Sequence, residues 1–330
     1  MDAQNGEAKS VGAGIVAIEH SAPATIESAD QVALKIGKSA EWVIEHAGVP
    51  NRRVCLPGDD PTELVAELAK PMIEKHGWPD LILNAGAMVR QMVPDNSVFI
   101  ARALGVVEIP AFSINATCLS FVVALNTARA LVNQGPYKRV LICSSEFPSR
   151  GRNFEQPESA ALLGDGCAAA IVERGADVGM IEHFQMKTWP EAADYAAVRG
   201  GGVMKKPCDP ATKHVDHVFD MKGERLLRFA LPRLRKFIRE FLRDARLSID
   251  DIAAIVPHQA SLSGMRILPK LGLPETRIVN ILETYGNCVA ASIPMALSVG
   301  AKTGRFQRGD RVMLLGTAAG MSIGAAIIRW

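Results

Sequence analysis

Apolar residues recur along the chain at two spacings, which predict strands and helices in alternation. Short apolar runs bounded by charged residues or glycine predict buried strands at residues 11–18, 80–86, 138–144 and 164–173. Apolar positions three and four residues apart predict amphipathic helices at residues 39–46, 62–75 and 96–104. Because strands alternate with helices, the pattern predicts a parallel α/β core.

The second half of the chain repeats the order of the first. The segments 251–256, 310–315 and 324–329 correspond to the apolar runs at 80–86, 138–144 and 164–173, with nearly equal spacing. An expected strand at 277–282, followed by the segment 286–291, corresponds to the strand and helix around Cys118. We therefore predict two duplicated halves, residues 1–176 and 177–330, whose central helices open at Cys118 and Asn287 and pack on each other.

Residues 189–218 interrupt this repeat. The segment is rich in proline and glycine and lacks periodicity, which is typical of an irregular functional loop or lid. A long amphipathic helix is predicted after it, over residues 223–247, with a kink at Pro232. Eight cationic residues face three acidic ones on its polar side, so this helix is a candidate docking surface for an acidic partner.

Composition changes this picture only in a few respects. At 330 residues the chain exceeds one usual hydrophobic core, and 48% hydrophobic with 22% charged residues is typical of a soluble globular protein. The polar N-terminal segment 1–10 and the absence of a long apolar run predict a cytoplasmic protein without a membrane partner. Six scattered cysteines show no C-x-x-C spacing, and the net charge of +2 gives no reason to expect nucleic acid.

The candidate chemistry begins at Cys118. An apolar run ends at Asn115-Ala-Thr117, and Cys118 then opens a segment with helical periodicity. At a strand-to-helix corner the helix macrodipole favours the thiolate, so we expect the pKa of Cys118 to be lowered toward neutrality. The simpler interpretation is a buried cysteine that acts as a small hydrophobic residue.

Three other features are expected at the same edge of the sheets. His258 follows the run 251–256, Asn287 is placed by the duplication as the counterpart of Thr117 and Cys118, and residues 316–320 form a small-residue turn where a backbone N–H could approach a carbonyl. Separately, His258 could be a core histidine and Asn287 a helix cap. Their occurrence together at matched strand ends favours a site.

These residues carry a family resemblance. Asn115-Ala-Thr-Cys118, Pro257-His-Gln-Ala260 and the string 286–294 resemble the three active-site motifs of β-ketoacyl-acyl carrier protein synthase III, in the thiolase superfamily. The resemblance runs from residues 39–53 through Gly164-Asp-Gly166 to Gly320 and Gly324. It implies a homodimer with a thiolase-like five-layer αβαβα fold. No metal or cofactor is implied beyond substrates carried on the phosphopantetheine of acyl carrier protein or on coenzyme A.

The resemblance also implies a role for each residue. Cys118 would form an acyl-enzyme from an acyl thioester, with the N–H groups of Cys118 and Gly320 as the oxyanion hole. His258 and Asn287 would bind a malonyl- or β-ketoacyl-thioester and stabilise its enolate for a Claisen condensation. Fatty-acid, polyketide or other secondary metabolism would be the setting.

Departures from the family pattern refine this expectation. Ser261 and Leu119-Ser120 replace the usual asparagine and Ala-Gly pair. Trp42 matches a residue that stacks on the adenine of coenzyme A, but His46 replaces one of its arginine neighbours, which favours a carrier-protein thioester. Val93 matches an apolar residue that reaches the partner subunit's acyl pocket. The cationic residues expected to dock the carrier are Arg225, Arg228, Arg235 and Arg239.

Two alternatives stay open. The same acyl-enzyme could serve an acyltransferase acting on an alcohol or amine, or a thioester hydrolase. The chain could also be a non-catalytic subunit that binds an acyl carrier for another protein. Retention of both His258 and Asn287 favours condensation, because acyl transfer has less need for two donors that stabilise an enolate. The sequence leaves open whether condensation is decarboxylative.

Overall fold

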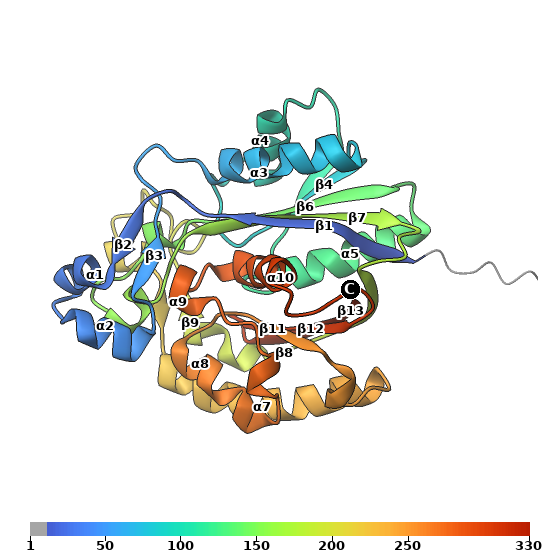
Figure 1. Ribbon diagram of the computed structural model, residues 1–330. Coiled ribbons are helices and arrows are strands. Elements are labelled where there is room, and N and C mark those ends of the chain that lie inside the picture. Colours follow the sequence, from blue (N-terminus) through green and yellow to red (C-terminus); the bar gives the residue numbers. More distant parts are fainter. Residues whose placement is uncertain (1–11) are drawn as a thin grey trace, which may run out of the picture.

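The computed structural model describes residues 12–330 and shows layers in the order helix, sheet, helix, sheet, helix (Figure 1). The polar segment 1–10 and the first residue of the strand expected at 11–18 lie outside the described residues. Among the described residues, no helix has the length and apolar character that crossing a membrane requires.

The first half forms one side of the molecule, with strand order β5-β4-β6-β7-β1. Its elements are β1 (Ala13–Ser21), α3 (Pro61–His76), β4 (Leu81–Ala85), α4 (Asn96–Leu104), β5 (Ala111–Ile114), α5 (Ser120–Gln134), β6 (Arg139–Glu146) and β7 (Gly166–Arg174). Strands β5, β4 and β6 are parallel, but β7 is antiparallel to both β6 and β1. The expectation of a parallel core is therefore corrected to a mixed sheet, because β6 and β7 are consecutive strands without a crossover helix of full length.

The second half has strand order β11-β12-β13-β8 with the same pairing senses. Its elements are β8 (Met180–Thr188), β11 (Ala254–Pro257), α10 (Ser292–Lys302), β12 (Arg311–Ala318) and β13 (Ser322–Arg329). Within residues 12–330, the two halves of the nine-stranded sheet join where Gly14 of β1 pairs with Met180 of β8. The division that we predicted between residues 176 and 177 falls in the turn between β7 and β8.

The strand expected at 277–282 is wrong. Ile278 makes a single parallel bridge to Ile255, between the short helices η6 (Glu275–Arg277) and α9 (Leu282–Tyr285). Beyond that bridge, side-chain oxygens accept the backbone N–H groups that a strand would use. The Ile281 N–H donates to Gln259 Oε1 at 3.0 Å, and the Leu282 N–H donates to Asn280 Oδ1 at 3.0 Å. These bonds end strand pairing after one residue.

Helices α5 and α10 lie between the two parts of the sheet, as the duplication predicted (Figure 1). Their buried residues share one core cluster with strands of both halves, for example Leu125 and Val132 of α5 with Ile293 and Leu297 of α10. A helix covered on both sides must be apolar around most of its circumference. This central layer sets the two corners at which the helices begin close to each other.

Outer helices cover the remaining sheet faces, α3 and α4 on one side and α7 (Gly223–Asp244) with α8 (Leu262–Ile267) on the other (Figure 1). The periodicity did not predict α1 (Ala29–Ile36), which lies beside α2 (Ala40–Ala47) and the two-stranded antiparallel sheet of β2 (Ile26–Ser28) and β3 (Asn51–Arg53). The insertion 189–218 is irregular as predicted. It holds η2 (Pro190–Tyr195), β9 (Ala196–Ala197) and η3 (His214–His217), and β9 pairs with β10 (Asp220–Met221).

The remaining elements are short. They are η1 (Pro148–Gly151), α6 (Pro157–Ala160), η4 (Ile249–Asp251), η5 (Pro269–Leu271) and η7 (Val289–Ala291). Helix α6 borders the end of α2, where the fully buried Arg52 donates to the carbonyl oxygens of Ala161 and, at 3.0 Å, Val49. This arginine ties the α2 region to the wall of the cavity described below.

Candidate active site

Cys118 stands in a tight turn between β5 and α5. The Thr117 N–H donates to Asn115 Oδ1 at 3.0 Å, and the Ala116 N–H donates to Ser120 Oγ at 3.0 Å. Thr117 has a φ of 50°, in the left-handed region that non-glycine residues seldom adopt. The turn therefore uses local strain and side-chain caps to present Cys118 at the start of the helix.

The turn before α10 repeats these features. The Val289 N–H donates to Asn287 Oδ1 at 2.8 Å, the Cys288 N–H donates to Ser292 Oγ at 3.0 Å, and Val289 has a φ of 47°. The counterpart of Asn287 is thus Asn115, and the counterpart of Cys118 is Ala290. Our sequence alignment of Asn287 with Thr117 and Cys118 was out of register, because hydrophobic spacing alone does not resolve a shift of a few residues.

The expected lowering of the Cys118 pKa is wrong. Burial and, after it, the nearby Glu146 carboxylate raise the pKa of the thiol to about 12, although the backbone N–H groups of Cys118 and Ala319 act in the opposite direction. Desolvation outweighs the macrodipole because Cys118 precedes the first residue of α5, Ser120, between two sheets. The second backbone donor at the sulfur is Ala319, one residue before the expected Gly320.

Glu146 is a site residue that the sequence analysis missed. Its carboxyl is fully buried at the end of β6 and accepts the N–H groups of Ala87 at 2.5 Å and Met88 at 3.0 Å. Burial raises its pKa to about 8, although these two hydrogen bonds act in the opposite direction. The only signal in the sequence was one acidic residue directly after an apolar strand.

His258 follows β11 and is 6% exposed. Its backbone N–H donates to the Leu315 carbonyl at 2.8 Å, while no partner for its Nδ1 is found among the described residues. Burial lowers the pKa of His258 to about 4, so the ring is neutral at pH 7. A neutral imidazole can donate one N–H hydrogen bond. It is a much weaker acid than the protonated ring, so it does not act as a general acid.

Gly316 of β12 lies next to His258 and to Leu119, the residue that follows Cys118. A Cβ built on Gly316 would lie 2.9 Å from Leu119 Cδ2 and 3.3 Å from His258 Cβ, so both pack against this glycine. Asn287 joins the same region, because its Nδ2 donates to the Ala260 carbonyl at 3.2 Å, two residues beyond His258.

Leu119, an unusual neighbour of the nucleophile, occupies a notch between two glycines. A Cβ on Gly324 would lie 3.2 Å from Leu119 Cδ1, and the distance for Gly316 is shorter still, at 2.9 Å from Cδ2. The leucine is fully buried. Its bulk is accommodated because β12 and β13 have no side chains at these positions.

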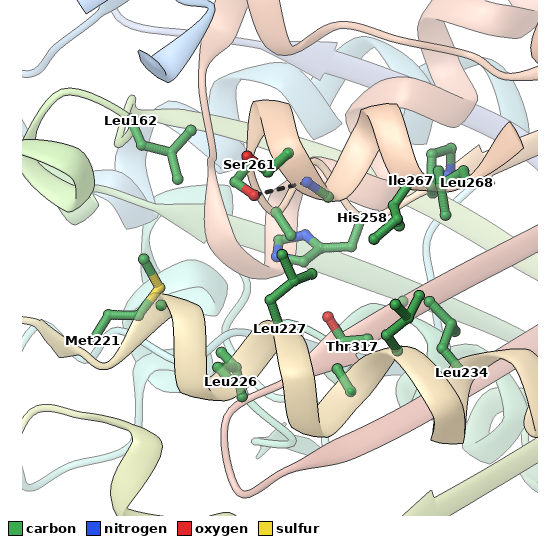
Figure 2. A pocket seen from close by; sticks show the side chains of 18 of the residues that line it. Leu162, Met221, Leu226, Leu227, Leu234, His258, Ser261, Ile267, Leu268 and Thr317 are labelled. Atoms are coloured by element: carbon green, nitrogen blue, oxygen red, sulfur yellow. Dashed lines mark hydrogen bonds between the residues drawn. The ribbon is translucent and has the colours of Figure 1, made fainter. Parts of the chain in front are cut away.

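A cavity of about 370 Å³ adjoins His258 and lies between α7 and α8. Figure 2 shows the His258 ring between the two helices, with Leu162 and Met221 to one side and Leu234, Ile267 and Leu268 to the other. Ser261 lies on its wall and caps α8 by accepting the Gly264 N–H at 3.0 Å. His258 and Ser261 therefore line the same cavity.

Other expected contacts lie outside this cavity. Trp42 stacks on His46 with ring centroids 4.3 Å apart, and it is His46 that reaches the cavity wall. Val93 is 80% exposed in the loop after β4, so a single subunit does not place it at the site.

Helix α7 lines the cavity with apolar residues, and its arginines lie on the side that faces solvent. Arg228 pairs with Glu224 at 3.0 Å, and the Arg225 guanidinium lies 4.4 Å from the Tyr195 ring centroid. Arg235 and Arg239 are exposed and form no ion pair with any of residues 12–330. Two of the four proposed docking arginines therefore remain uncompensated.

Comparisons with known proteins show the family. Residues 112–190 match the family described as 3-oxoacyl-[acyl-carrier-protein (ACP)] synthase III, and residues 242–330 match its C-terminal part. The chain is 32% identical over 310 residues to a β-ketoacyl-[acyl-carrier-protein] synthase III of Rhizorhabdus wittichii, covering 91% of this chain and 93% of that one.

Solved structures are similar over nearly the whole chain. A β-ketoacyl-[acyl carrier protein] synthase III of Thermus thermophilus is 27% identical with a TM-score of 0.86, covering 96% of this chain and 99% of its own. A priming β-ketosynthase of a polyketide biosynthetic pathway is 25% identical with a TM-score of 0.87, covering 96% of both chains. The five-layer thiolase-like fold is confirmed by these structures.

Proposed function

The chain belongs to the 3-oxoacyl-[acyl-carrier-protein] synthase III family of condensing acyltransferases, and we propose that it joins an acyl group held on Cys118 to a second thioester by Claisen condensation. The observation that carries this proposal is the neutral, buried His258 on the wall of the cavity, next to the loop that Asn287 contacts. His258 and Asn287 are two neutral hydrogen-bond donors, and such donors stabilise the oxygen of an enolate without transferring a proton to it.

In the first step, the Cys118 sulfur attacks the carbonyl carbon of an acyl thioester. The N–H groups of Cys118 and Ala319 donate to the oxygen as it becomes negative, which replaces our expectation of Gly320 in the oxyanion hole. The C–S bond to the carrier breaks, and the carrier thiol leaves with the proton that Cys118 lost. The product is an acyl-enzyme.

In the second step, His258 and the Nδ2 of Asn287 donate to the carbonyl oxygen of a malonyl- or β-ketoacyl-thioester. Loss of carbon dioxide, or transfer of the acidic α-proton of a β-ketoacyl group to solvent water, leaves an enolate that both donors stabilise. Its α-carbon attacks the acyl carbon, a carbon–carbon bond forms, and the Cys118 thiolate leaves and recovers a proton. Acyl transfer or hydrolysis would share only the first step.

We infer that the acyl donor is a carrier-protein thioester, in fatty-acid or polyketide metabolism. His46 already covers a face of Trp42, and the carboxylates of Glu158 and Glu224 line the cavity, so a nucleotide with several phosphates is disfavoured here. The free Arg235 and Arg239 suit an acidic carrier. Charge reversal at both should raise KM for carrier-bound acyl groups and leave small thioester mimics unaffected, whereas equal effects would reject docking.

We further propose that the protein is a homodimer that pairs through β5. This strand ends the nine-stranded sheet order, and an uncovered edge strand is a template for pairing. Phe112 on β5 is 42% exposed, and the nearby loop exposes Val93 to a partner. Light scattering should give twice the chain mass, and Phe112→Lys should shift it toward the monomer.

Intact-protein mass spectrometry tests the function directly. Incubation with acyl-carrier and acyl-coenzyme A thioesters should give an acyl adduct that Cys118→Ser abolishes, and malonyl or β-ketoacyl thioesters should discharge it into a longer product. Discharge only to water, alcohol or amine would instead establish an acyltransferase or hydrolase. Absence of any adduct would favour a non-catalytic carrier-binding subunit.

A further inference from the structure

The cavity beside His258 has an apolar end to which the two proposed steps assign no group. Resting on the proposed condensation, we propose that its far end binds the aliphatic chain of the second thioester. The enzyme would then use an extender with a long alkyl chain, such as a β-ketoacyl thioester, in preference to an unsubstituted malonyl group.

The two ends of the cavity differ in character. Glu224 and Met221, with His46 and Glu158, lie at the end where α7 begins. The other end is walled by Leu231 and Leu234 of α7, facing Ile267 and Leu268 of α8 and its border (Figure 2). All ionisable lining groups except His258 therefore belong to the first end.

The apolar end follows from the sequence of the two helices. Leu227, Leu231 and Leu234 recur at spacings of four and three, which places them on one face of α7. On the opposite side, Gly264 has no side chain, and a Cβ there would have no neighbour closer than Ser261 Oγ at 3.2 Å. A leucine stripe facing a glycine leaves space between the helices.

An aliphatic chain is the occupant that this chemistry favours. An apolar cavity lined by leucine and isoleucine stays dry and binds apolar molecules. A pantetheine arm carries two amides that need hydrogen-bond partners, and the four aliphatic side chains at the far end offer none. No lysine or arginine is among the described residues that line the cavity, so a second free carboxylate finds no ion pair there.

The position relative to the catalytic groups assigns the chain to the second substrate. The cavity wall includes His258, Gly316 and Thr317 but, among residues 12–330, not Cys118. A thioester whose carbonyl oxygen meets His258 would have its carrier arm toward Glu224 and its other end toward Leu234.

Calorimetry can measure the affinity of the cavity for aliphatic probes independently of turnover. The probes are 2-oxoalkyl thioethers of pantetheine with tails of increasing length, titrated into Cys118→Ala protein, which cannot be acylated. We expect affinity to rise roughly fourfold for each added methylene until the cavity is full. Affinity that does not change with tail length would overturn the proposal and leave the carrier arm as the occupant.

Two filling variants localise the effect. Gly264→Leu and Leu231→Phe should abolish the dependence on tail length while keeping affinity for the shortest probe. Leu242→Phe, on the same helix but outside the cavity, is the matched control and should retain the full dependence. Equal loss for short and long probes in both filling variants would contradict an aliphatic subsite.

Product analysis separates this inference from the function on which it rests. With wild-type acyl-enzyme, long-chain β-ketoacyl thioesters should give more condensation product than malonyl thioester, and the filling variants should reverse this preference. Condensation with malonyl alone, at equal rates in all variants, would refute the subsite and keep the function. An acyl-enzyme that never forms a carbon–carbon bond would refute the function, whatever the calorimetry shows.

Discussion

In the turn before α5, Asn115 accepts the backbone N–H two residues later, and in the turn before α10 Asn287 does the same. Each turn also has a serine four residues after the N–H that it accepts, and a β-branched residue at positive φ. The differences lie in what projects from this shared backbone. One turn presents Cys118 where the other has Ala290, and Asn115 is exposed where Asn287 reaches the His258 loop.

The comparison shows how a duplicated scaffold can divide two chemical steps. The first turn supplies the nucleophile, and the second supplies a donor for the enolate. The backbone strain and the caps are common to both, so they serve the scaffold, while single side chains set the chemistry. Each prediction below changes one turn and uses the other as its control.

The largest effect should come from making the first turn resemble the second at the nucleophile. Cys118→Ala gives the residue found at position 290 and should lower acyl-enzyme formation by about three orders of magnitude or more, because no other nucleophile is presented. Mass spectrometry of the adduct measures this. Cys288→Ala, in the other turn, should acylate like the wild type, and a loss there would break the comparison.

Asn287→Ala should lower the condensation rate by about 10²- to 10³-fold and leave acylation intact, because a donor to the enolate is lost. Asn115→Ala removes the same cap from the other turn and is the matched control. It should lower condensation far less. If both variants lose acylation equally, the two asparagines are only caps; single-turnover kinetics of both steps decides.

The two steps should also differ in pH dependence. With the pKa of Cys118 raised to about 12 by burial, the thiolate fraction and the acylation rate should rise about tenfold per pH unit between pH 5.5 and 7.5, below the titration of Glu146. His258, with its pKa lowered to about 4, is neutral throughout this range, so discharge of a preformed acyl-enzyme should stay flat. Rapid-quench rates at each pH test this, and a flat acylation profile would contradict the buried thiol.

The smallest effects concern the shared caps. Ser120→Ala and Ser292→Ala each leave a buried N–H without its acceptor, which should cost about 1–3 kcal/mol of unfolding free energy. Ser120→Ala should cost more, because Ser120 also donates to the Thr117 carbonyl at 2.6 Å. Denaturant melts of both variants measure the difference. A larger loss for Ser292→Ala would show that the turns are not equivalent.

Much of the fold could be read from periodicity, because buried strands and amphipathic helices leave regular patterns. The order of elements, the paired central helices and the irregular insertion were all accessible in this way. The strand at 277–282 was not, since it is stopped by the side chains of Gln259 and Asn280, which a hydrophobic pattern does not register. Helix α1 was missed although Ser28 caps it.

The site was accessible in residue type but not in electrostatics. Motifs predicted Cys118, His258 and Asn287; in the structure Leu119, next to Cys118, and His258 both pack on Gly316, and Asn287 bonds to Ala260 in the loop after His258. The direction of the Cys118 pKa could not be predicted, because desolvation depends on the second sheet that covers the turn. The choice between Ala319 and Gly320, like the carboxyl of Glu146, depends on backbone directions that the sequence does not encode locally.

The notch that holds Leu119 also constrains how this sequence can change. A methyl group at Gly316 would meet the leucine at 2.9 Å, so alanine there requires the Leu119 side chain to shift or to be replaced by a smaller one. In mutational terms the three positions 119, 316 and 324 are epistatic. During evolution, a substitution that enlarges residue 119 is favoured only once glycine is present on β12. In the reverse direction, a smaller residue at 119 is favoured before either glycine is replaced.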